Sequence, residues 1–176
     1  MELKVFKQNT YNDGEIMSFE SQLESFLSNS EKLIVLGVGN DLKCDDGVGP
    51  FIIKRLKEED IEDENLIFIN AETVPENFTG KLRKENPTHI IIVDACLMNG
   101  NPGDMQIVDK DDFSNIGIST HSMSLSYFVK YLEKGNDFKI IFVGIEPESL
   151  DYGENLTENV EKTAFEFINI LKGIIL

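Results

Sequence analysis

Two aspartates and one histidine are spaced along this sequence so that a parallel sheet would bring them to one edge. Asp46 follows an apolar run at 33–36, Asp94 directly follows another at 90–93, and His121 precedes a helical pattern. Ligands of open α/β sheets bind beyond the carboxyl ends of the strands. Two carboxylates and one imidazole leave coordination positions of a divalent metal open, as catalytic metal sites do. Asp46, Asp94 and His121 are therefore the candidate catalytic and metal-contacting residues.

Each of these residues also has a structural interpretation. Asp94 could cap the turn after its strand, and His121 could be a hydrogen-bonded residue at a helix N-terminus. Asp45 is a rival for Asp46, because adjacent side chains usually point apart and only one of the two is expected to face the site. If an antiparallel strand precedes His121, the chain leaves that strand beside the amino ends of the parallel strands. The following loop then has to return to their carboxyl ends, where Asp46 and Asp94 are expected.

Three further residues could contact a metal but are kept out of the site. Cys44 and Cys96 each lie two residues from a candidate aspartate, so soft ligands could approach the same centre. Two cysteines are too few for a disulfide framework, so we interpret both as free thiols. We expect each to be a small buried hydrophobic residue. His89 precedes a buried run and is expected at the opposite end of its strand from Asp94.

The first apolar run leads into a glycine-rich turn that spans residues 37–49. A dinucleotide-binding G-x-G-x-x-G turn would need its third glycine where Leu42 stands, and Asp45 and Asp46 would repel a pyrophosphate at the helix N-terminus. Tight turning with a close backbone approach is a sufficient reason for the glycines. We expect no nucleotide cofactor.

The hydrophobic pattern alternates between strands and helices. Short apolar runs predict strands covered on both faces, and periods near 3.6 residues predict helices. The predicted strands are 33–36, 66–69, 90–93 and 140–143, and the helical patterns are 48–56, 125–132 and 160–171. Residues 105–108 alternate instead, which indicates an antiparallel edge strand. This order predicts one α/β domain of three layers, with a mainly parallel sheet and helices on both faces.

The chain divides into an extension, residues 1–30, and a domain, residues 31–176. Phe19, Leu23 and Phe26 lie on one face of an amphipathic stretch in the extension, which predicts a helix packed on the domain. A partner-binding arm is the alternative interpretation.

Composition excludes several classes of function. The 176 residues include 32 acidic and 16 basic ones, and the net charge of −16 would repel nucleic acid but suits a protein partner with a basic surface. No apolar run approaches the roughly 18 residues of a membrane span. The first residues lack the pattern of a secretory signal, so we expect a soluble cytoplasmic protein.

Several motifs, in order, resemble the hydrogenase maturation protease family over about residues 32–172. The quoted motifs are Gly37-Val38-Gly39-Asn40, Asp45-Asp46-Gly47-Val48-Gly49, Asp94-Ala95, Asn101-Pro102-Gly103, Thr120-His121-Ser122 and Phe142-Val143-Gly144-Ile145-Glu146-Pro147-Glu148-Ser149-Leu150. Pro75-Glu76-Asn77 and the segment 120–126 look most like the branch that processes the hydrogenase of formate hydrogenlyase. Asn70-Ala71-Glu72-Thr73 departs from the glycine pair that is common in the family after the second strand.

The resemblance implies an endopeptidase that removes the C-terminal extension of a nickel-iron hydrogenase large-subunit precursor after nickel insertion. It also implies that Asp46, Asp94 and His121 contact nickel, which arrives with the substrate and serves for recognition. The family is often catalogued with aspartic-type peptidases, but this residue set favours metal assistance. Which carboxylate acts as general base stays open, and we expect a monomer.

Two other functions fit the same residues. One is a related metal-dependent hydrolase of another substrate, because one fold supports many chemistries. The other is a non-catalytic nickel-binding maturation factor. The sequence does not identify the hydrogenase or the residues at the cut.

Overall fold

A five-stranded mixed sheet forms the centre of the protein. The computed structural model describes residues 17–59, 61–108 and 122–176. The strands are β1 (Leu33–Val38), β2 (Leu66–Glu72), β3 (His89–Ala95), β4 (Met105–Val108) and β5 (Lys139–Ile145). Their order is β2-β1-β3-β5-β4, and only β4 runs antiparallel to its neighbour. The predicted mainly parallel sheet with one antiparallel edge strand is confirmed.

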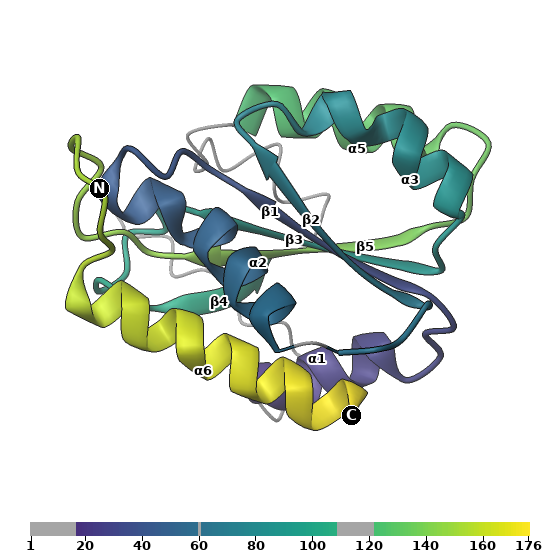
Figure 1. The fold of residues 1–176 in the computed structure, drawn as a ribbon, viewed down its shortest axis with the longest axis horizontal. Coiled ribbons are helices and arrows are strands. Elements are labelled where there is room, and N and C mark those ends of the chain that lie inside the picture. Colours follow the sequence, from purple (N-terminus) through teal and green to yellow (C-terminus); the bar gives the residue numbers. More distant parts are fainter. Residues whose placement is uncertain (1–16, 60, 109–121) are drawn as a thin grey trace, which may run out of the picture.

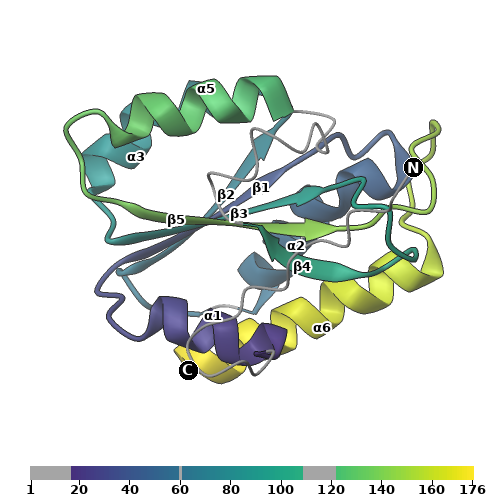
Figure 2. The same ribbon diagram turned by 180° about the vertical axis from the view of Figure 1, so that it is seen from behind.

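Helices cover both faces of this sheet, as Figures 1 and 2 show. One face carries α1 (Phe19–Leu27), α2 (Val48–Glu58) and α6 (Glu158–Ile175), and the other carries α3 (Thr79–Glu85) and α5 (Ser122–Glu133). Two 3-10 helices, η1 (Cys44–Gly47) and η2 (Pro75–Phe78), follow β1 and β2. The predicted three-layer α/β domain is therefore confirmed. Within the described ranges, no helix combines the length and apolar character that crossing a membrane requires.

The continuous apolar runs supply two separate cores. In β1, Ile34 and Leu36 face the core under α3 and α5, whereas Leu33 and Val35 face the core under α1, α2 and α6. Successive side chains of a strand point to opposite faces, so a strand between two helix layers must be apolar at every position. This packing fixes the ends of β1, β3 and β5, from which the candidate site is built.

The run 66–69 is covered on both faces, as predicted, but less completely than the central strands, since Ile67 and Ile69 pack in one core and Leu66 and Phe68 pack against the other. The run forms β2 at one edge of the sheet, where Leu66, Ile67 and Phe68 are only half-buried and Ile69 is buried. An apolar run shows that a strand has helices near it but not how many strands flank it.

The helix α1 packs on the sheet through apolar side chains. Leu23 and Leu27 are buried, and the Phe19 ring meets the Phe167 ring of α6 edge to face, with centroids 6.3 Å apart. The Phe26 ring meets His89 in the same way. The division of the chain at residue 30 stays a prediction.

Candidate functional site

The glycine-rich turn packs the start of α2 against the ends of two strands. Gly39 has a φ of +141°, and a Cβ atom added there would lie 1.8 Å from the Asp46 carbonyl oxygen. A Cβ atom at Gly49 would lie 2.2 Å from the Val38 carbonyl oxygen and 2.7 Å from that of Val93. Only residues without a side chain allow these approaches. Close backbone packing therefore explains the glycines.

This turn holds Asp46 in a buried position. Asp46 lies in η1, and its Oδ2 accepts a hydrogen bond of 3.1 Å from the backbone N–H of Asn40. The Asn40 side chain in turn accepts from the backbone N–H of Leu42, at 3.0 Å. Both bonds lie within the turn, so the chain between β1 and α2 has little freedom to move the carboxylate.

Asp94 is the second buried candidate and lies at the same edge of the sheet. It is the next-to-last residue of β3 and pairs in register with Gly144 of β5. The turn that carries Asp46 packs against β3. The two aspartates therefore come from neighbouring strand ends, whereas His121 lies outside the described residues. Convergence of all three side chains on one ion stays a prediction.

Asp45, the rival of Asp46, is occupied by the loop that follows β5. Its side chain is fully buried, and Oδ1 accepts from the Thr157 backbone N–H at 2.7 Å. Oδ2 accepts from the backbone N–H groups of Glu148 and Ser149, at 2.8 and 2.9 Å, and from the Thr157 hydroxyl at 3.0 Å. Adjacent side chains do point apart here: Asp45 joins two loops, and Asp46 is the one bonded within its own turn.

Glu146 is a buried carboxylate to which the sequence interpretation gave no role. Its Oε2 accepts from the backbone N–H groups of Met98 and Gly100, at 2.5 and 3.2 Å, and so holds the loop after β3. Gly144 and Ile145 separate Glu146 from the apolar run 140–143, whereas Asp94 directly follows the run 90–93, so the spacing gave no equal signal for Glu146. Asp45 and Glu146 position the loops around Asp46 and Asp94.

Both cysteines are free, and both pack against neighbouring groups. Cys96 is buried in the core under α5; burial, and then the charges of Asp94 and Glu146, raise the pKa of its thiol well above the ordinary value. Cys44 is partly buried, and its Sγ lies so close to Gly153 that a Cβ atom there would be 2.6 Å from it. These surroundings fit the interpretation of small packed residues.

A metal would find oxygen ligands here but no complete set in the described part of the chain. No group of three or more His, Cys, Asp or Glu side chains among the described residues is placed to hold an ion. Asp46 and Asp94 supply two carboxylates, so further ligands would have to come from His121 or from a bound substrate. Oxygen ligands and open positions suit a catalytic divalent ion more than a structural one.

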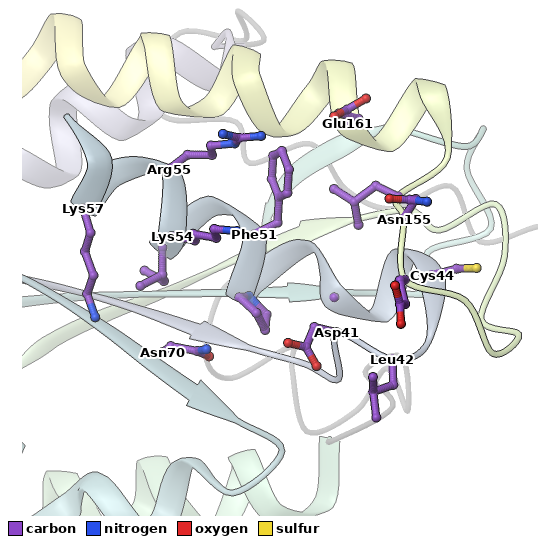
Figure 3. A pocket seen from close by; sticks show the side chains of 15 residues that line it. Asp41, Leu42, Cys44, Phe51, Lys54, Arg55, Lys57, Asn70, Asn155 and Glu161 are labelled. Atoms are coloured by element: carbon purple, nitrogen blue, oxygen red, sulfur yellow. The ribbon is translucent and has the colours of Figure 1, made fainter.

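An open groove of about 870 Å³ adjoins the turn (Figure 3). Asp41 and Leu42 line its end near β1, and Phe51 and Arg55 extend from α2 toward α6. The two buried aspartates are not among its lining residues. The groove therefore adjoins the turn that carries Asp46 without including either carboxylate.

Comparison with known proteins identifies the family that has this fold. The family model for hydrogenase maturation protease (HycI) matches residues 50–173, and the chain belongs to this family. A protein from Methanocaldococcus jannaschii that is assigned to these proteases is 40% identical over 155 residues, which cover 85% of this chain and 91% of the relative. The hydrogenase 3 maturation protease of Escherichia coli K12 is 31% identical over 141 residues, or 80% and 88% of the two chains.

Solved structures agree with this assignment. A nickel-iron hydrogenase maturation protease from Thermococcus kodakarensis KOD1 superposes with a TM-score of 0.80 at 27% identity, over 88% of this chain and 99% of that one. The hydrogenase maturating endopeptidase HybD from E. coli gives a TM-score of 0.69 at 30% identity, over 80% and 89%. The protein is thus a hydrogenase maturation endopeptidase, a hydrolase of peptide bonds, as the sequence motifs predicted.

Proposed function

We propose that this endopeptidase removes the C-terminal extension of a nickel-iron hydrogenase large-subunit precursor once nickel is in place. The observation that carries this proposal is the pair of buried carboxylates, Asp46 and Asp94, at the carboxyl edge of a sheet in a chain of this family. Asp45 is already engaged by four hydrogen bonds from the loop after β5. Asp46 is therefore the member of the acidic pair assigned to the reaction.

Nickel enters this proposal as part of the substrate. Asp46, Asp94 and His121 contact the nickel that the precursor already holds through its own cysteines. Two carboxylates and an imidazole leave positions open, and nickel also accepts thiolates. A metal shared by the two proteins makes recognition depend on nickel insertion, so the tail is removed only from a loaded precursor.

The protein side chains have two tasks in the cut. A carboxylate near the scissile peptide orients the substrate through the metal, and a carboxylate that accepts a proton from water acts as general base. Asp46 and Asp94 divide these tasks between them.

The proposal extends to the setting of the reaction. The enzyme acts in the cytoplasm, as a monomer. It uses no nucleotide, because the glycine-rich turn is filled by the backbone contacts of Gly39 and Gly49.

Incubation with a nickel-loaded large-subunit precursor tests this function. Intact-mass analysis is expected to show one discrete shortening of the precursor at its C-terminus. A related hydrolase of another substrate would leave the precursor intact, and so would a non-catalytic nickel-binding factor, although that factor would form a stable complex with it. An unshortened precursor with a folded enzyme would contradict the proposal.

A further inference from the structure

Two loops at the carboxyl edge are bonded to each other across the end of β3. They are residues 41–46, after β1, and residues 148–157, after β5, and we name them the paired loops. The Cys44 N–H donates to the Gly153 carbonyl at 2.7 Å, and the Gly153 N–H donates to the Leu42 carbonyl at 3.0 Å. The Asp45 carboxylate adds the four bonds described above. Since β3 lies between β1 and β5, the pairing spans the strand whose next-to-last residue is Asp94.

The paired loops carry two large apolar side chains that face solvent. Leu42 is 57% exposed and Tyr152 is 84% exposed, while the backbone beneath them is held by the bonds above. The Lys43 ammonium lies 5.5 Å from the centre of the Tyr152 ring. Exposed apolar groups on a fixed backbone, next to a site, are typical of interaction surfaces, and a tyrosine is a frequent anchor.

Charge on the same loops points to one kind of partner. Asp41, Glu148, Asp151 and Glu154 are exposed, whereas Lys43 is the only basic residue in the two loops. The complementary surface is an apolar residue flanked by lysine or arginine. A nucleic acid or another acidic chain would be repelled.

The groove of Figure 3 gives such a partner room to extend. Asp41, Leu42 and Cys44 line it from the first paired loop, and Glu154, Asn155 and Leu156 line it from the second. The paired loops therefore connect the groove to the turn that holds Asp46. A peptide in extended conformation that lies in the groove would contact both loops.

We propose that the paired loops dock the segment of the precursor that adjoins the scissile bond. An apolar residue of that segment packs on Leu42 and Tyr152, and a neighbouring lysine or arginine meets Asp151 and Glu154. This inference rests on the proposed function and adds the surface and the chemistry by which the precursor is recognised.

Steady-state cleavage of the nickel-loaded precursor tests the paired loops. Leu42→Ser and Tyr152→Ser are each expected to raise KM about tenfold and to leave kcat nearly unchanged, because they remove an anchor that contacts the substrate before and during the reaction. Tyr152→Phe keeps the ring and is expected to keep the KM. Tyr127→Ser is the matched control, since Tyr127 is 71% exposed on α5, away from the loops, and is expected to leave KM unchanged.

Charge reversal gives a second, independent measurement. Asp151→Lys is expected to raise KM, and the difference from wild type should shrink as salt is added, because salt screens exposed charges. Circular dichroism of each variant checks that it is folded.

The outcomes separate the two proposals. A wild-type enzyme that cleaves the precursor, with unchanged KM in both folded serine variants, would overturn docking on the paired loops and leave the proposed function standing. An equal rise of KM in Tyr127→Ser would also overturn it. A folded wild-type enzyme that does not cleave the loaded precursor would overturn the proposed function and the docking surface together.

Discussion

The amino and carboxyl ends of the parallel strands, here the amino edge and the carboxyl edge of the sheet, are surrounded by different kinds of side chain. At the amino edge, the Thr88 hydroxyl oxygen accepts from the backbone N–H groups of Glu31 and Lys32, at 3.0 and 3.1 Å. His89 is buried there against the Phe26 ring, with ring centroids 4.9 Å apart. At the carboxyl edge lie the acidic residues that are buried in the described part of the chain, Asp45, Asp46, Asp94 and Glu146.

This difference shows where the protein has accepted the cost of burying charge. A buried carboxylate is unfavourable unless hydrogen bonds compensate it. The carboxylates of Asp45 and Glu146 accept hydrogen bonds from backbone N–H groups and thereby fix two loops. Those loops surround Asp46 and Asp94. We therefore expect changes at the carboxyl edge to affect cleavage, and changes at the amino edge to affect only stability.

The largest effect is expected from the two aspartates assigned to the reaction. Asp46→Asn and Asp94→Asn each remove a charge without changing the shape, and we expect kcat/KM for precursor cleavage to fall about a hundredfold or more. His121→Ala is expected to do the same. Asp137→Asn is the control, because Asp137 is exposed just before β5, at the amino edge. Full activity in Asp94→Asn would reject its role.

The second-largest effect is expected when Asp45 loses its hydrogen bonds to the loop after β5. Asp45→Ala leaves the N–H groups of Glu148, Ser149 and Thr157 without their acceptor, and we expect the free energy of unfolding to fall by about 3 kcal/mol. Thr157→Val removes only the hydroxyl bond and should cost about 1 kcal/mol. Urea denaturation measures both. An Asp45→Ala protein of unchanged stability would show that the contact does not hold the loops.

A change at the amino edge should separate stability from activity. Thr88→Val removes the acceptor for two backbone N–H groups, and we expect a loss of about 1–2 kcal/mol of unfolding free energy. Cleavage by the remaining folded enzyme should be unchanged, because Thr88 lies at the opposite end of β3 from Asp94. A lower kcat in this variant, measured below its unfolding temperature, would argue against the separation of the two edges.

The smallest effect concerns pH. Burial, and then the charge of Lys139, lower the pKa of His89 below its ordinary value of 6.5. The unfolded chain then binds a proton more readily than the folded one, so this histidine costs stability as pH falls through 6.5 toward its folded pKa. Between about pH 7.5 and pH 5.5, His89→Gln is expected to show a smaller loss of unfolding free energy than wild type. Equal slopes would exclude a contribution from His89.

The sequence predicted the strands well because a strand between two helix layers must be apolar at each position, as 90–93 is in β3. It did not predict that 66–69 lies at an edge, since strand order depends on packing between segments far apart. The helix α3 was missed because its seven residues bury only Leu82 and give no clear period.

The sequence was sufficient to predict which residue types form the candidate site and that they lie at the carboxyl ends of the strands. Adjacent aspartates could be expected to diverge, but the bonds that engage Asp45 come from residues more than a hundred positions away, at Glu148 and Ser149. No spacing rule gives such partners. Glu146 was missed for the same reason, because its role depends on the loop after β3.

The most direct test of the shared nickel is cleavage of one precursor in two states. Wild-type enzyme is incubated with matched nickel-loaded and nickel-free precursor, and intact mass is followed with time, with Asp94→Asn in parallel. We expect the tail to leave only the loaded precursor and only with the wild-type enzyme. Equal shortening of the nickel-free precursor would contradict recognition through a nickel that Asp46, Asp94 and His121 contact.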